Sequence, residues 1–267
     1  MSTPTGPDRR DSSFPPGRFT PDPRAAAPAS MIAASARLEL RLTLRNGEQL
    51  LLALIIPLAA LIGGTLLTVI ALPEPRIDTV TPGVLALAVL STAFTSQAIT
   101  TGFDRRYGVL KRLAAAGMSR PQLIAGKATA ALAVVAVQFG VLGGVALLMG
   151  WHPDGSPLWL LVVTVLGTAA LLGLALLLGG TLRAEAVLGL ANIAWLIMVV
   201  LGGVIVPLDS APQWLQTIGA LTPAGALSQA LRAVLQAGAA PPGTSLAVLA
   251  GWIVLGWAGT VRWFRWQ

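Results

Sequence analysis

The sequence predicts an all-α, polytopic membrane protein with about six transmembrane helices and both ends in the cytoplasm. Three observations support this prediction: a composition poor in charge, a series of long apolar runs, and an uneven distribution of basic residues. Of 267 residues, 55% are hydrophobic and 11% are charged, whereas roughly 25% are charged in an average soluble domain. Because a soluble chain needs charge to cover its core, most apolar side chains here must face lipid.

The apolar runs define the spans, since a spanning helix needs about 20 mostly apolar residues. Seven runs lack Asp, Glu, Lys and Arg. One of them, 210–231, contains Pro223, which would clash with the preceding turn in mid-helix. We therefore predict two short helices, 211–222 and 224–236, which enter the membrane from the outer side without crossing it. The six predicted spans are 50–72, 83–103, 128–150, 157–180, 186–206 and 244–263.

The basic residues support this count, because loops on the cytoplasmic side of a membrane carry an excess of Lys and Arg. With the N-terminus inside, sixteen basic residues fall on the inner side, and Lys127 is counted among them. Only Arg76 and Arg232 fall on the outer side. A seventh span would place Arg262 outside. The asymmetry therefore favours six spans in a cell membrane, with both termini cytoplasmic.

Two segments precede the first span. Residues 1–30 contain seven prolines and no apolar core of a signal peptide, which predicts a disordered cytoplasmic tail. Residues 31–48 carry Arg37, Arg41 and Arg45 at four-residue intervals, so the arginines share one face of a helix. We expect this helix to lie in the inner interface with its arginines on lipid phosphates. A plain topology anchor is a compatible alternative.

The loop after the second span, residues 104–127, is much longer than a connection requires. Leu110, Leu113 and Ala114 share one helical face. Gly117 can end this helix, and Ser119 can cap the next one. The pattern predicts a short amphipathic helix whose leucines form a docking surface for a cytosolic protein. A positive-inside loop without a partner is the simpler alternative.

At this loop the sequence resembles the permeases of ABC-2 type transporters, an exporter family that includes daunorubicin-resistance-like permeases. A second resemblance lies in 203–207, 212–215, 221–223 and 230–232, which are similar to the family's extracellular re-entrant helices before the last span. The likeness covers about residues 31–267, with a transmembrane domain over 49–267. The residues of the first motif that match are Asp104, Arg105, Gly108, Leu110, Lys111, Arg112, Leu113, Gly126 and Lys127.

The resemblance implies a permease subunit that moves a hydrophobic or amphipathic substrate out of the cytoplasm, as in multidrug efflux. ATP and Mg²⁺ would bind to a separate ABC-type ATPase, present in two copies, and the path would lie between two permease chains in a homodimer or a heterodimer. Because no Gly-x-x-x-x-Gly-Lys-Ser/Thr run occurs in the sequence, we expect no ATP hydrolysis by this chain itself. The implied ATPase-coupling residues are Asp104, Arg105, Gly108, Leu110, Lys111, Arg112 and Leu113.

Polar residues inside predicted spans are candidates for the translocation path. Thr92, Ser96 and Thr100 share one face of the second span, and Gln138 and Asn192 lie in the third and fifth. The alternative for each is a hydrogen bond between helices. Gly140 and Gly144 form a face of small residues that suits either internal packing or a dimer contact.

Other functions find less support. The chain has no cysteine and one histidine, His152, so we expect no metal site. We expect no nucleic-acid partner either, because the basic residues lie in short segments between apolar runs. A membrane enzyme would need convergent His, Asp or Glu near an interface. A secondary transporter and a non-transporting assembly subunit remain alternatives.

Overall fold

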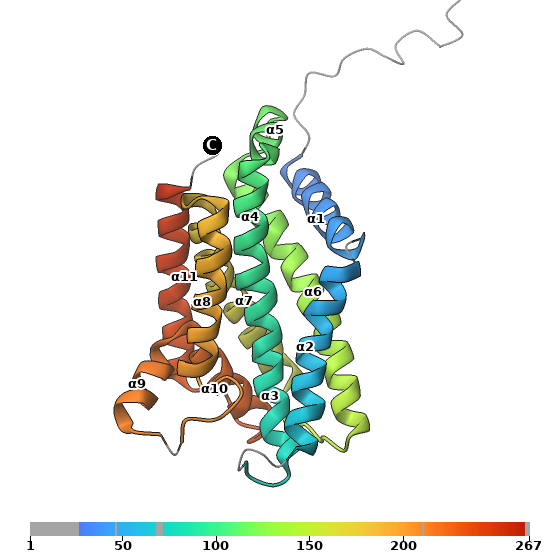
Figure 1. Cartoon of the computed structure of the whole chain (residues 1–267), viewed down its shortest axis with the longest axis vertical. Helices are drawn as coiled ribbons and strands as arrows, with labels where there is room; N and C mark the ends of the chain where they lie inside the picture. The colour runs from blue at the N-terminus through green and yellow to red at the C-terminus, as the bar shows by residue number, and fades with distance from the viewer. Residues whose placement is uncertain (1–26, 46, 68–71, 210, 265–267) are drawn as a thin grey trace, which may run out of the picture.

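The structure is a computed structural model that describes residues 27–45, 47–67, 72–209 and 211–264. Within these ranges the chain is a bundle of helices without strands (Figure 1). Most of the predicted tail lies outside the described residues, but Pro28–Ser30 already belong to the first helix. The helices are α1 (Pro28–Arg45), α2 (Gly47–Leu66), α3 (Arg76–Val89), α4 (Gln97–Arg106), α5 (Val109–Ala115), α6 (Arg120–Leu148), α7 (Pro157–Thr181), α8 (Ala184–Leu201), α9 (Gln213–Leu221), α10 (Pro223–Leu235) and α11 (Gly243–Trp263).

The second predicted span is the central helix of the bundle. A π-helical segment, η1 (Leu90–Ser96), joins α3 to α4, so the helix runs without a break over Arg76–Arg106. In its apolar part 89% of the residues are buried, against 28–50% in the other four long apolar helices. The other helices therefore pack around this one and turn their remaining apolar surface outward, as expected for a protein in lipid.

Five described helices are long and apolar enough to cross a membrane, and they correspond to predicted spans two to six. The apolar part of α2 that can be assessed, Ala53–Leu66, is shorter, so the count of six stays a prediction. The helices extend past the predicted spans at several ends, because polar residues at a membrane surface can still be helical. Thus α6 begins at Arg120 rather than at 128, whereas α8 ends at Leu201, five residues before the predicted end.

The proline-containing run before the last span, 210–231, belongs to two short helices, α9 and α10, as predicted. Thr222 lies between them and accepts a hydrogen bond from the Gly225 N–H at 3.0 Å. Pro223 therefore occupies the first turn of α10, where a missing N–H has no cost. In Figure 1 both helices lie at the end of the bundle opposite α5. Their re-entry into the membrane stays a prediction.

The two arginines counted as outer-loop charges contact backbone carbonyl groups. The buried Arg76 donates to the carbonyls of Gly64 and Leu67, at the end of α2. Arg232 donates to the carbonyls of Thr79 and Val204, at 3.0 and 2.8 Å, and so ties α10 to α3 and to the segment after α8. Carbonyl groups past the end of a helix lack intrahelical partners and carry partial negative charge. The carbonyls of Gly64, Leu67 and Val204 are such groups, so the two cations hold the ends of α2 and α8.

Glycines of α7 and α6 lie in different surroundings, one tightly packed and the other open. A Cβ on Gly179 of α7 would lie 2.6 Å from the Ala98 carbonyl oxygen and 2.9 Å from Thr101 Cβ, so only glycine permits this approach of α4. A Cβ on Gly140 or Gly144 of α6 would meet no described atom within 4 Å. Of the two roles considered for these α6 glycines, internal packing among the described residues is thereby ruled out.

This contrast gives a matched pair of variants. Gly179→Ala should destabilise the protein by about 1–3 kcal/mol, because the added methyl group overpacks the α4–α7 seam. Gly140→Ala should leave stability unchanged or raise it slightly, since alanine favours a helix over glycine. Thermal unfolding of both variants in detergent checks this. Equal melting temperatures would contradict the packing described for α7.

Candidate functional site

The loop predicted as a coupling element folds as a short helix between two glycine turns. Gly108 has φ of +70° and ends α4, and Gly117 has φ of +84° and ends α5. Ser119 then starts α6 through a capping box, in which the Ser119 N–H donates to Gln122 Oε1 at 2.9 Å. Left-handed backbone and a serine cap both favour the breaks seen here. The predicted short helix over this loop is confirmed.

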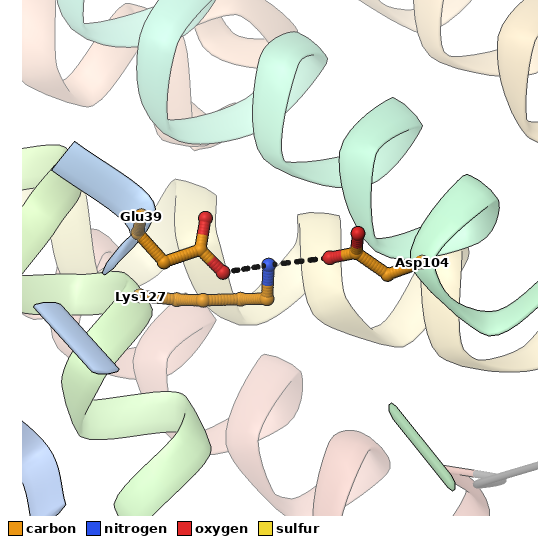
Figure 2. Close-up of polar contacts among 3 residues, drawn as sticks. All are labelled: Glu39, Asp104 and Lys127. Carbon is orange, nitrogen blue, oxygen red and sulfur yellow. Dashed lines mark hydrogen bonds and ion pairs between the residues drawn. The ribbon is translucent and has the colours of Figure 1, made fainter. Parts of the chain in front are cut away.

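A buried lysine joins three helices at the base of this loop. Lys127 of α6 has no exposed surface. Its Nζ donates to Glu39 Oε1 of α1 at 2.6 Å and to Asp104 Oδ2 of α4 at 3.0 Å (Figure 2). The two carboxylates are 15% and 22% exposed. An ammonium group removed from water is strongly disfavoured unless it is paired, so the ion pairs fix the relative positions of α1, α4 and α6.

The residue before this lysine allows α1 to come close. A Cβ on Gly126 would lie 2.4 Å from Ser35 Oγ and 2.6 Å from Ser35 Cβ. Ser35 and Ala36 are buried, whereas Arg37, Arg41 and Arg45 of the same helix are exposed. Gly126 and Lys127 therefore act together, because Gly126 lets α1 approach closely and Lys127 binds the Glu39 carboxylate of α1.

The arginines at the end of α4 bind the turn between α7 and α8. Arg105 Nη1 donates to the Gly180 carbonyl at 2.6 Å, and its Nη2 donates to the Leu182 carbonyl. Arg106 forms an ion pair with Glu185 at the start of α8. The end of the central helix is thus tied to α1 and α6 through Asp104, and to α7 and α8 through two arginines.

Leu110 and Leu113, which were predicted to form a docking surface for a cytosolic protein, pack against their own chain. Leu110 is completely buried and packs with Leu123 and Phe264, and Leu113 and Met118 lie half-buried against this cluster. Leu110 therefore contacts its own chain and does not face a partner, because the end of α11 covers it. The exposed surface, named here the α5 outer face, consists of Tyr107, Lys111, Arg112, Ala115 and Ala116.

The predicted path residues do not come together at one place. Thr92 Oγ1 donates to Gln138 Oε1 at 2.9 Å, and Gln138 Nε2 donates to the Ala53 carbonyl at 3.0 Å, which links η1, α6 and α2. Ser96 and Thr100 are half-buried. Asn192 is exposed on α8 and donates to its own helix at Leu188. Thr92 and Gln138 therefore join helices, which was the alternative reading of these residues.

Two residues of this cluster differ from what the sequence predicted, because Glu39 was not expected at the site and Lys127 was expected in a loop. Lys127 was counted as a loop charge, but it lies inside α6 and is buried. One signal was available for Glu39, which is the single acidic residue among the arginines of α1. An acid on the face opposite an arginine stripe indicates a basic partner inside the protein.

Comparison with known proteins supports one family. The family model described as "ABC-2 type transporter" matches residues 31–235, which include most of α1, the loop that carries α5 and the end of α10. A comparison with curated protein sequences finds no significant match.

Among variants of the Lys127 cluster, a triple substitution should be more stable than a single one. Lys127→Met should destabilise the protein by about 3–5 kcal/mol, because it leaves two carboxylates close together without a counter-charge. The triple variant Lys127→Met/Glu39→Gln/Asp104→Asn should recover much of this loss, since no buried charge remains. Thermal unfolding in detergent measures both. A triple variant no more stable than Lys127→Met would contradict the ion-pair account.

Leu110 gives a second prediction. Leu110→Asp should unfold the end of the bundle, because it buries a carboxylate among Leu123 and Phe264. Leu110→Met should cost less than about 1.5 kcal/mol, since its volume is similar. Limited proteolysis after Lys111 and Arg112 reports local unfolding. Equal resistance of Leu110→Asp and the unsubstituted protein would show that Leu110 faces solvent.

Proposed function

Because the chain belongs to the ABC-2 type transporter family, we propose that it is the permease subunit of an ATP-driven exporter of hydrophobic or amphipathic substrates. The family consists of membrane permeases rather than catalytic chains and normally works with an ABC ATPase. The chain is an integral membrane protein.

The observation that carries the proposal is the packing of α5 against the end of the bundle. Leu110, on the inner face of α5, is completely buried against Leu123 and Phe264, while Lys111 and Arg112 remain exposed. Single glycine turns connect α5 to α4 and lead on to α6. A force applied to the α5 outer face by an ATPase would therefore reach the central helix through α4. Two exposed cations suit an acidic surface on that ATPase.

The central helix is the best candidate for the element that moves when an ATPase displaces α5. Its π-helical segment departs from regular α-helical hydrogen bonding, and such segments are frequent at functional sites. Three buried polar atoms near it, Thr95 Oγ1, Gln97 Oε1 and Thr101 Oγ1, have no hydrogen-bond partner among the described residues. Water or a polar group of a substrate would satisfy them. We place the path along this helix, where Ser96 and Thr100 also lie.

The proposed assembly follows the family pattern. Two ATPase subunits would hold ATP and Mg²⁺, and a second permease chain, identical or related, would complete the path. The helices α1 and α5 lie at one end of the bundle, and α9 and α10 lie at the other (Figure 1). Arg37, Arg41, Lys111 and Arg112 are exposed at the first end. This distribution supports a cytoplasmic location of that end and of both termini in the cell membrane.

Co-purification tests the partner. The unsubstituted chain, co-expressed with an ABC-class ATPase of its own genome, should retain that ATPase. Arg112→Glu should weaken retention by about tenfold or more, because charge reversal on the α5 outer face repels an acidic partner. The matched control is Arg262→Glu, an exposed arginine at the end of α11. Retention of no ABC-class ATPase, or equal loss in both variants, would contradict the proposed docking surface.

A further inference from the structure

A basic pocket lies beside α5, at the end of the bundle that the charges place in the cytoplasm. Its volume is about 410 Å³. It opens between the end of α4, the start of α5 and the turn that begins α8. The lining residues are Gly102, Arg105, Arg106, Gly108, Lys111, Arg183, Ala184 and Glu185.

The charges of this pocket do not balance. Four cations and one carboxylate line it. Glu185 is paired with Arg106. The Arg105 guanidinium donates to the carbonyl groups of Gly180 and Leu182. The pocket therefore has a net charge of about +3 by simple count, which favours an anion.

Two of these cations are available to a ligand. The Lys111 and Arg183 side chains are exposed, and neither forms a hydrogen bond or ion pair with the part of the chain that the structure describes. They approach the pocket from different elements, α5 and the turn before α8. The start of α8 adds the partial positive charge of a helix N-terminus. An anion held here would thus have contacts on two sides.

An apolar surface continues from the pocket toward the middle of the bundle. Glu185, Leu188, Asn192 and Leu196 follow one another at three- and four-residue intervals, so they share one face of α8. Leu188 is 45% exposed and Leu196 is 57% exposed. This face is one turn from the pocket and runs along the membrane-spanning helix. A ligand with an anionic head and long apolar tails would match both parts.

We propose that this pocket binds the phosphate head group of an anionic glycerophospholipid of the inner leaflet, with its acyl chains along the exposed face of α8. Lys111 and Arg183 supply the positive charge that binds the phosphate, and Leu188 and Leu196 contact the chains. The proposal rests on the membrane location of the chain and does not depend on ATP-driven export. Since Lys111 lies at both surfaces, the bound lipid borders the place proposed for the ATPase.

The test measures lipid retention by the purified full chain in detergent. Phosphatidylglycerol is titrated against phosphatidylcholine, and native mass spectrometry counts bound lipid. The double variant Lys111→Gln/Arg183→Gln should bind phosphatidylglycerol about tenfold more weakly, because each cation near an anionic lipid contributes severalfold in affinity. Both residues are exposed, so melting temperatures should remain unchanged. The matched control, Arg112→Gln/Arg262→Gln, removes the same charge at the same end of the bundle but outside the pocket.

Four results would overturn the proposal. Equal weakening in both double variants would indicate diffuse attraction to a basic surface. Displacement of the lipid by millimolar inorganic phosphate would indicate a site for free anions. Unchanged retention in the pocket variant would show that the lipid binds elsewhere. Loss of ATPase co-purification with unchanged lipid retention would assign the pocket to the partner protein. Since the readout needs no ATPase, failure here leaves the proposed function to its own test.

Discussion

The arrangement of the described helices depends on the pairing of one buried ammonium group. Lys127 has no exposed surface and contacts a carboxylate of α1 on one side and a carboxylate of α4 on the other (Figure 2). A buried charge without partners would cost several kcal/mol, so these three helices can separate only together with a large loss of stability. Helix α1, the central helix and α6 are therefore held together at the base of the loop that carries α5. Gly126 makes this possible, because no larger residue would let Ser35 come so close.

Arginine side chains fasten the remaining helix ends in a similar way. Arg76, Arg105 and Arg232 each donate to carbonyl groups at or after the end of another helix. In a membrane protein such carbonyls have few other donors, because lipid offers none. The guanidinium group suits this task, since its several N–H donors can reach more than one carbonyl at once. The helix ends are thereby fixed without disulfides, and the packing glycines bring the helices close enough for the arginines to reach.

These contacts leave two different exposed surfaces on the loop that carries α5. The inner face of α5 packs on Leu123 and Phe264, while its outer face stays exposed and basic. The neighbouring pocket faces the start of α8 and the apolar surface below it. A partner protein and a lipid could then occupy adjacent surfaces of the same short helix. One glycine turn separates α5 from the most buried apolar helix of the bundle. A displacement of α5 would therefore reach the polar residues around η1 through α4 alone.

The sequence by itself determined the all-α membrane class, the positions of most long helices, the break at Pro223 and the short helix between Gly108 and Gly117. Each of these depends on local properties, namely apolar run length, proline geometry and glycine turns, which act within a few residues. It also pointed to the family through the residues around Lys127. Only the tertiary structure decided that Leu110 faces inward, that Lys127 is buried, and that Glu39, 88 residues earlier in the chain, is its partner. The same holds for the polar residues of the spans: Thr92 and Gln138 bond to each other inside the bundle, whereas Asn192 is exposed on α8. Long-range neighbours determine these roles, and a single sequence does not show which of its apolar and polar faces will meet.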